Sequence, residues 1–431
     1  MTESPRHFVD LFAGCGGLSL GLEDAGFAPA FVSELNKDAL ETYLTNRADR
    51  HPLLLHEEFH GNDIKELVVR KGAIARLSAN IASAYGIDAR AGELDLVVGG
   101  PPCQGFSGIG HRRSYSVSKE QMPSNHLFED MVYVVSKLRP KVFLFENVRG
   151  LLSARWTPAG TKGEIWKDVQ KTFAEQLPDY VIRWELVHAK DYGVPQNRPR
   201  VLMVGVRGDI GHRLELDDHK RAGGLLPQPI GVPPDLVDVL GDLVDPTFNQ
   251  GGLASTDQYP SEATSSIQKY FRRDPDSGRI LPRGAPLTEH EYSRHSPRVV
   301  AKFVHMLEND GVIPAEYRTK KFAQRALPPR WGTTGPTITA TSLPDDYVHY
   351  AQPRSLTVRE WARLQTFPDW YSFAGKRTTG GVRRAGNPRE GIFDRELPKY
   401  TQIGNAVPVL MGRAVGEHLL KILSGRLNVV A

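Results

Sequence analysis

The run HFVDLFAGCGGLSLGL, residues 7–22, is the stretch that most directly indicates the fold of this 431-residue chain. Residues 7–12 are mostly apolar, as expected for a buried strand, and Gly14, Gly16 and Gly17 follow at once, where a helix should begin. In open α/β sheets, glycines at this turn allow the backbone to approach a nucleotide-like ligand. The run therefore predicts a first strand, a ligand-binding loop and a crossover helix.

Acidic residues further along narrow the class of ligand. The third glycine of a dinucleotide fingerprint would fall at Ser19, which favours a nucleoside without phosphates. Glu34 stands twenty residues after Gly14, at the end of the next expected strand, where an acid commonly receives a ribose diol. Asp63 is expected at the end of a further short strand, and it suits an adenine amino group. Either acid alone is more often a solvated carboxylate, but together they predict an adenosine cofactor.

Apolar runs alternate with helical patterns from residue 7 to about residue 206, which is typical of a parallel sheet with crossover helices. Apolar spacing predicts helices over 127–138, behind Asn125 as N-cap, and over 165–177, and we interpret these stripes as core packing. The predicted class is α/β: a doubly wound, mostly parallel Rossmann-like sheet with a second, smaller irregular domain. Strands are expected at residues 7–12, 28–34, 94–99, 142–146, 181–187 and 201–206.

The character of the chain changes beyond residue 208, where prolines interrupt it and clear periodicity fades. Two segments of this region, 316–330 and 376–395, are strongly basic, although such a run is usually a solvated surface. Helical patterns return at 356–367 and at 405–423. This part of the chain therefore predicts a second domain with little regular structure.

Composition limits the class of protein. With 40% apolar and 24% charged residues the chain is an ordinary globular protein, and it has neither an apolar signal core at its start nor an apolar stretch of membrane-spanning length. We expect a cytoplasmic protein with no membrane partner. Two cysteines exclude a disulfide framework, and the 14 histidines show no metal-ligand spacing, so no metal is expected. The net charge of +4 permits an acidic polymer as partner without demonstrating one.

Cys103 lies in the run DLVVGGPPCQGFS, residues 95–107. An apolar strand leads to two glycines, and Pro101 and Pro102 then fix the backbone just before the thiol. A lone free cysteine is more often a small buried side chain. Here the sulfur is expected at the carboxyl end of a strand, where open α/β sheets bind ligands, and this position predicts a nucleophile.

Glu146 follows four apolar residues at the end of another expected strand, so burial should raise the pKa of its carboxyl. A proton on Glu146 is then available to a ring nitrogen of a substrate while the Cys103 thiolate attacks the adjacent carbon. The alternative is that Glu146 pairs with Arg149 or caps the following turn. In QNRPR, residues 196–200, Arg200 suits an exocyclic oxygen of the substrate and Arg198 a neighbouring carboxylate.

Taken together, these motifs resemble those of the DNA cytosine-5 methyltransferases, the S-adenosylmethionine-dependent family of bacterial modification systems and their eukaryotic relatives. The resemblance runs through most of the chain in the family's own order, which makes it far more specific than any single motif. The matching motifs are FAGCGG at 12–17, Glu34, Asp63, PPCQ at 101–104, NHL at 125–127, ENV at 146–148, QNRPR at 196–200, RSLTVRE at 354–360, ARLQTFP at 362–368 and QIGNAVP at 402–408.

The resemblance implies a reaction and a role for each catalytic residue. Cys103 corresponds to the nucleophile that adds to C6 of cytosine, Glu146 to the residue that engages N3 and the exocyclic amine, and Arg200 to the contact to O2, with Arg198 supporting it. The methyl group comes from S-adenosyl-L-methionine, S-adenosyl-L-homocysteine is the product, and the target base is flipped out of the duplex.

The resemblance also implies binding residues. Cofactor contacts carry over to Phe12, Gly14, Gly16, Leu18, Glu34, Asp63, Pro101, Leu127, Asn405 and Val407. DNA contacts carry over to Gln104, Ser107, Arg112, Arg113 and Thr339.

The domain plan and the partners follow from the same resemblance. A catalytic and cofactor-binding domain is expected at residues 1–208, and a target-recognition domain at 209–398, which includes the motif at 354–368. The segment 399–431 should form a helix that returns to the catalytic domain. The expected partner is double-stranded DNA, a cognate restriction endonuclease is possible, and we expect a monomer in a bacterial cytoplasm.

Two other functions remain open on the sequence. One is an RNA cytosine-5 methyltransferase on the same scaffold, which the long recognition region disfavours. The other is a catalytically silent DNA-binding relative, which the intact Cys103, Glu146 and Arg200 disfavour.

Overall fold

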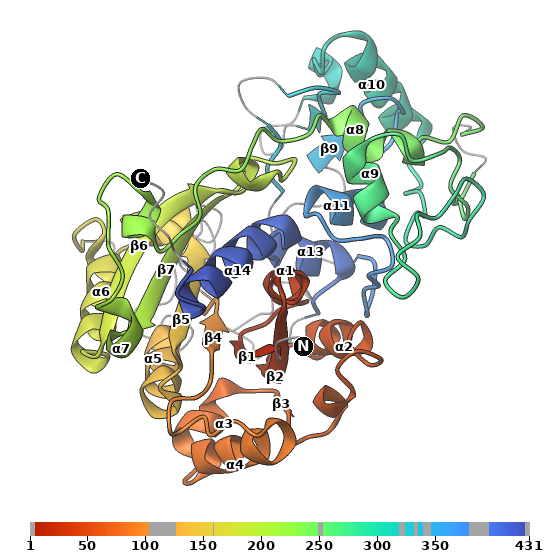
Figure 1. Ribbon diagram of the computed structural model, residues 1–431. Coiled ribbons are helices and arrows are strands. Elements are labelled where there is room, and N and C mark those ends of the chain that lie inside the picture. The colour runs from red at the N-terminus through yellow and green to blue at the C-terminus, as the bar shows by residue number, and fades with distance from the viewer. Residues whose placement is uncertain are drawn as a thin grey trace, which may run out of the picture. The chain divides into compact units, whose positions relative to one another are not determined.

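The computed structural model describes residues 5–102, 126–157, 159–248, 253–318, 324–331, 335–338, 346–378 and 396–426 (Figure 1). The chain divides into two compact units. The first comprises Met1–His188, Pro199–Ile230 and Met411–Ala431, and the second comprises Ala189–Arg198 and Gly231–Leu410. The functional division predicted from sequence, at residues 208 and 398, stays a prediction.

The first unit contains a seven-stranded sheet in the order β3-β2-β1-β4-β5-β7-β6. Neighbours among β1 to β5 run parallel, whereas β7 runs antiparallel to both β5 and β6. The mostly parallel, doubly wound sheet is therefore confirmed, and the six expected strands are present within two residues at each end. The strands are β1 (Arg6–Leu11), β2 (Phe27–Ser33), β3 (His60–Gly61), β4 (Leu96–Gly99), β5 (Val142–Val148), β6 (Tyr180–His188) and β7 (Pro199–Arg207).

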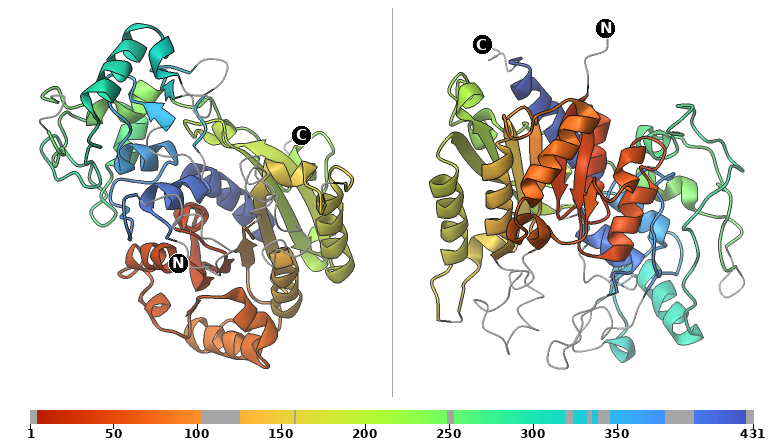
Figure 2. Two further views of the ribbon diagram at one scale, coloured as in Figure 1. Left: turned by 180° about the vertical axis from the view of Figure 1, so that it is seen from behind. Right: turned by 90° about the horizontal axis from the view of Figure 1, so that it is seen from below.

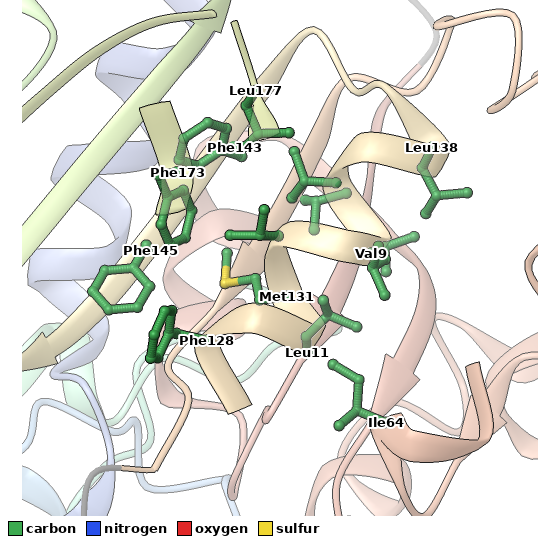
Figure 3. Close-up of a cluster of buried hydrophobic side chains, with 14 of the residues drawn as sticks. Val9, Leu11, Ile64, Phe128, Met131, Leu138, Phe143, Phe145, Phe173 and Leu177 are labelled. Carbon is green, nitrogen blue, oxygen red and sulfur yellow. The ribbon is translucent and has the colours of Figure 1, made fainter. Parts of the chain in front are cut away.

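Helices cover both faces of this sheet (Figures 1 and 2), and successive side chains of β1 point to these two faces in turn. Val9 and Leu11 face the main core, where Phe143 and Phe145 of β5 pack near Phe173 (Figure 3). Asp10, between them, points to the opposite face and accepts a hydrogen bond from the Ser19 hydroxyl. The helices of the first unit, which can be followed in Figures 1 and 2, are α1 (Gly17–Ala25), α2 (Lys37–Thr45), η1 (Pro52–Leu55), α3 (Ile64–Val69), α4 (Ala73–Tyr85), α5 (Leu127–Leu138), η5 (Arg149–Ser153), α6 (Glu164–Gln176), α7 (Gly208–Gly211), η7 (Arg221–Gly224) and α14 (Val409–Leu423).

The last helix, α14, packs closely on α1 because two of its residues lack a side chain. A Cβ added at Gly412 would lie 2.9 Å from the Leu18 carbonyl oxygen, and one at Gly416 would lie 2.8 Å from the Ala25 Cβ. The end of the chain thus rests on the helix that follows the glycine-rich loop.

The prediction of one helix over 405–423 is wrong. Helix α13 ends at Asn405 and α14 begins at Val409, because Pro408 lacks an N–H and disfavours helical geometry in the residue before it. The amides of Val409 and Leu410 instead donate to the Gln365 carbonyl and the Thr366 hydroxyl.

The second unit has short elements, and small apolar clusters lie around Leu243 and around Phe303 in its described residues. Its helix α11 is shorter than the expected 356–367 because the capping box of Thr357 and Glu360 starts it at Val358. The elements are η6 (Ala189–Tyr192), α8 (Leu236–Leu240), η8 (Gly241–Leu243), α9 (Ser266–Phe271), α10 (Pro297–Glu308), η9 (Ala315–Tyr317), β8 (Arg325–Ala326), β9 (Tyr347–Val348), α11 (Val358–Leu364) and α13 (Lys399–Asn405).

Charged and imidazole side chains are buried inside this irregular unit. Arg354 donates two hydrogen bonds to the Glu360 carboxylate, at 2.8 and 2.6 Å, and both side chains are almost fully buried. His349 lies 3.5 Å from the same carboxylate, yet burial lowers the pKa of His349 to about 3. Burial likewise lowers the pKa of His290 to about 4. Both imidazoles are therefore neutral in the folded unit at neutral pH.

These histidines predict acid sensitivity. A folded-state pKa below the ordinary 6.5 means that the unfolded chain binds the proton first, so stability is lost as the pH falls from 6.5 towards the folded values. In urea denaturation between pH 7 and pH 5, we expect His349→Gln to reduce the slope of unfolding free energy against pH by up to about 1.4 kcal/mol per pH unit. The control Phe303→Leu removes a buried side chain of α10 that does not titrate, so it should lower the free energy of unfolding without changing its slope against pH. Equal slopes for His349→Gln and wild type would contradict the assignment.

Candidate active site

The strand register brings four chain segments to one edge of the sheet. Leu11, the last residue of β1, pairs with Ser33 of β2 and with Gly99 of β4, and Gly99 pairs with Phe145 of β5. Because these strands are parallel, the residues that come next along each chain segment are neighbours at the carboxyl edge. They are Phe12, Glu34, Gly100 and Glu146.

The glycine-rich loop after β1 follows a path that ordinary residues rarely adopt. Phe12, Gly14 and Gly16 have φ values of 59°, 57° and 82°. Gly16 is the N-cap of α1 and supplies no side-chain cap, so the first amides of this helix are left for other partners. A Cβ built on Gly14 would meet no atom of the described chain within 4 Å, which leaves space over the loop.

Glu34 closes one side of this loop. Its Oε2 accepts from the Gly14 amide at 2.8 Å and its Oε1 accepts from the Asn36 amide at 2.8 Å. Burial raises the pKa of the Glu34 carboxyl, and the two amide hydrogen bonds oppose that rise. A carboxylate offers about four acceptor positions. The two amides therefore leave it able to accept from a pair of hydroxyl groups such as a ribose diol.

The next residues form the adenine side of the expected pocket. Asp63 is the N-cap of α3, and its Oδ1 accepts from the Lys65 amide at 2.9 Å. Leu35, directly after Glu34, is 70% exposed and was not singled out from the sequence. The available signal was an apolar side chain outside the strand, next to an acid that is expected to bind ribose. Leu127, also expected at the cofactor, is the half-buried first residue of α5.

Two small polar side chains in the loop and the first turn of α1 point into the protein. Ser19, at the third-glycine position, is buried and donates to Asp10, and burial raises the pKa of Asp10 to about 7. Cys15 is 2% exposed, and burial raises the pKa of its thiol to about 12. A buried thiol with so high a pKa is inert as a nucleophile.

Glu146 and Arg200 form the charged centre on the other side of the edge. Val148 of β5 pairs with Arg200 of the antiparallel β7, so Glu146, two residues earlier on the same face, is its diagonal neighbour. The Arg200 Nε lies 2.6 Å from the Glu146 Oε1, and these side chains are 8% and 12% exposed. Burial lowers the pKa of Arg200, and the Glu146 carboxylate opposes that shift.

The turn after β4 lies against this pair. A Cβ on Gly100 would lie 2.8 Å from the Glu146 Oε2, so the carboxylate occupies the space that a side chain would need. The neighbouring Asn147 is buried and donates from Nδ2 to the Pro101 carbonyl at 3.0 Å. Strand β5 thus fixes the proline turn, which the structure describes as far as Pro102.

Several predicted site residues lie outside the described residues: Cys103, Gln104, Ser107, Arg112, Arg113 and Thr339, together with the expected cap Asn125. Asn405, exposed, and Val407, buried, lie at and just after the end of α13 in the second unit. Their cofactor contacts stay predictions.

Arg198 also belongs to the second unit. It is buried there and donates to the carbonyls of Ile338 and Gly404, the latter at 2.6 Å. The sequence expectation for Arg198 is a neighbouring carboxylate, whereas these hydrogen bonds run to the backbone. The bonds anchor the segment before β7, and a supporting role in catalysis stays a prediction.

The described part of the chain holds no group of three or more His, Cys, Asp or Glu side chains placed to bind a metal ion. None of its helices is both long and apolar enough to span a bilayer.

The fold and the carboxyl-edge site are those of a Rossmann-like methyltransferase. Residues 6–421 match the family model for the C-5 cytosine-specific DNA methylase. The Type II methyltransferase M.DdeI of Desulfomicrobium norvegicum is 29% identical over 96% of this chain and 88% of its own length. The Type II methyltransferase M.XorII of Xanthomonas oryzae pv. oryzae is 31% identical over 96% of this chain and 84% of its own length.

A solved structure has a similar fold. It is that of a putative DNA modification methyltransferase from an Escherichia coli prophage, with a TM-score of 0.65 and 22% identity over 97% of this chain and 99% of that one. The chain belongs to the C-5 cytosine-specific DNA methylase family and is a DNA (cytosine-5)-methyltransferase. Membership implies the use of S-adenosylmethionine as methyl donor and of DNA as substrate.

The closeness of Gly100 to the Glu146 carboxylate predicts that a side chain at position 100 lowers activity without unfolding the protein. In Gly100→Ala the new Cβ displaces the end of a flexible carboxylate, so the fold should be little affected. A displacement of about 1 Å at a reacting group costs on the order of 100-fold in rate. We expect such a loss in a methyl-transfer assay with little change in melting temperature. Gly241→Ala, where the nearest atoms are 3.7 Å away, is the matched control, and equal activity of the two variants would refute the positional role.

Proposed function

We propose that this enzyme methylates C5 of a cytosine flipped out of a specific duplex DNA sequence, through a covalent bond between Cys103 and C6. The observation that carries the proposal is the buried Glu146–Arg200 pair, with its 2.6 Å separation, against the turn that leads to Cys103. A carboxyl group and a guanidinium group side by side match the N3 and O2 atoms of cytosine, since one donates or shares a proton there and the other donates to the oxygen.

In this proposal the Cys103 thiolate adds to C6 while Glu146 holds a proton at N3 and Arg200 donates to O2. The electron pair of the C5–C6 bond then becomes available at C5. Bound S-adenosylmethionine supplies an electrophilic methyl group to that carbon. The C5 proton then passes to solvent and its bonding pair re-forms the C5–C6 double bond. The C6–S pair returns to the sulfur of Cys103 and the N3 proton returns to Glu146, so the aromatic ring is restored and the enzyme is freed.

The residues of the glycine-loop side fit S-adenosylmethionine. The uncapped N-terminus of α1 at Gly16 suits the carboxylate of its amino acid part, since amides and helix dipole both favour an anion there. Glu34 suits the ribose diol, Asp63 the adenine amino group, and the exposed Leu35 the face of the adenine ring. Ser19, turned inward, is consistent with a cofactor that lacks a pyrophosphate.

We also propose how the enzyme recognises its DNA and which partners it has. Residues 209–398 read the target sequence, and the basic segments of that region contact the phosphate backbone. Flipping the base costs a few kcal/mol of unstacking and exposes its face to sulfur. The Type II names of the relatives support a partner endonuclease of the same sequence specificity, and we propose that the methyltransferase acts as a monomer.

The chain offers a matched pair of variants because it contains only two cysteines. Cys103→Ala should abolish transfer of labelled methyl groups to duplex DNA, since no other nucleophile is proposed. Cys15→Ala should retain transfer, because the Cys15 thiol is buried and protonated. Retained activity in Cys103→Ala would refute the proposed nucleophile.

The nature of the polymer is tested by comparing substrates. We expect labelled methyl transfer to duplex DNA and none above background to transfer RNA, with bisulfite sequencing locating 5-methylcytosine in one sequence context. Transfer to RNA alone would favour the RNA methyltransferase, and DNA binding without transfer would favour the silent relative.

A further inference from the structure

Arg47, two residues beyond the end of α2, is buried beneath the glycine-rich loop and belongs to none of the motifs above. Its side chain is 1% exposed, and its NH2 group donates to the Gly16 carbonyl at 3.2 Å. We propose that Arg47 is a positioning residue for the cofactor, because it sets the orientation of the loop that receives the methyl donor. The inference rests on the proposed function, in which this loop binds S-adenosylmethionine.

The Gly16 carbonyl is the critical contact. It accepts the first helical hydrogen bond, from the Leu20 amide at 2.9 Å, and Arg47 takes its second acceptor position. Gly16 itself stands in the left-handed region at φ 82°, where glycine has most freedom to move. Two donors on one carbonyl fix the peptide plane between Gly16 and Gly17, and with it the direction of the amides at the start of α1.

The guanidinium group is itself held firmly. Its Nε donates to the Glu23 Oε1 at 2.7 Å, and its NH1 donates to the Tyr43 carbonyl at 3.1 Å. The Tyr43 ring lies 3.7 Å beneath the guanidinium carbon. Glu23 lies on α1 and Tyr43 on α2. Arg47 therefore ties both helices to the loop through the planar fork that arginine provides and lysine lacks.

A purely structural salt bridge would explain why Arg47 contacts Glu23. It would not explain why Arg47 also donates a hydrogen bond to the Gly16 carbonyl. Burial alone would raise the pKa of Glu23. The nearby Arg47, His51 and Arg50 have the larger combined effect and lower this pKa, so the carboxyl group stays ionised. His51 and Arg50 lie 3.3 and 3.9 Å from Glu23 and are more exposed. Of these three residues, Arg47 is the one seen to donate a hydrogen bond to the loop carbonyl.

The test separates the charge pair from the loop contact. Arg47→Met leaves Glu23 buried without its main partner and should lower the melting temperature as well as the affinity for S-adenosylmethionine. The double variant Glu23→Leu with Arg47→Met replaces the pair by apolar side chains, which commonly restores stability. We expect the double variant to recover the melting temperature while its dissociation constant for S-adenosylmethionine, from calorimetry, stays about tenfold weaker than wild type.

Arg47→Lys is the second variant, because it keeps the charge beside Glu23. It should melt close to wild type and still bind the cofactor more weakly, with a raised KM for S-adenosylmethionine and an unchanged kcat at saturation. Arg50→Met, which removes the more distant partner of the same Glu23, is the control and should change neither quantity.

Wild-type affinity in the double variant or in Arg47→Lys would overturn the positioning role and reduce Arg47 to a structural residue. Failure of the wild-type protein to bind S-adenosylmethionine is a different result, since it would overturn the proposed function first. The two failures are distinguished by the wild-type titration alone.

Discussion

The alignment of parallel strand ends is the constraint on which the whole site depends. Because Leu11, Ser33, Gly99 and Phe145 are paired in register, the four chain segments that continue from them meet at one edge of the sheet. The glycine-rich loop and Glu34 occupy one half of that edge, and the Gly100 turn and Glu146 occupy the other. The proposed cofactor half and the proposed reacting half of the site thus both follow from strand order and register.

Buried ion pairs give this edge its fixed geometry. Glu146–Arg200 at the reacting half and Glu23–Arg47 under the cofactor half are both largely withdrawn from water, as is Glu360–Arg354 in the second unit. Such pairs contribute little net stability, because desolvation offsets their attraction. Their effect here is on geometry. Each pair holds a carboxylate or a guanidinium group in one orientation, within hydrogen-bond distance of backbone or loop atoms.

Much of this arrangement was predictable because buried strands are continuous apolar runs and parallel strands end together. Glu34 and Glu146 were found for that reason. Other features depend on contacts between distant residues, which a local pattern does not contain: Arg47 meets Gly16 and Glu23, 31 and 24 residues away, and β7 inserts antiparallel beside β5. The prediction of one helix over 405–423 is wrong because the apolar periodicity continues past Pro408, whereas the proline separates two helices.

The central claim is that a thiolate bond to C6 activates the cytosine, and it is tested most directly by covalent trapping. A fluorine at C5 cannot leave as a cation, so an enzyme that adds to C6 and methylates C5 stays attached to the base. Duplex DNA copied with 5-fluorocytosine in place of every cytosine presents the analogue in all sequence contexts. With S-adenosylmethionine present, wild-type enzyme should form a complex that survives a denaturing gel, and Cys103→Ala should form none. Enzyme that methylates ordinary DNA yet leaves no trapped complex on the fluorinated duplex would contradict the account.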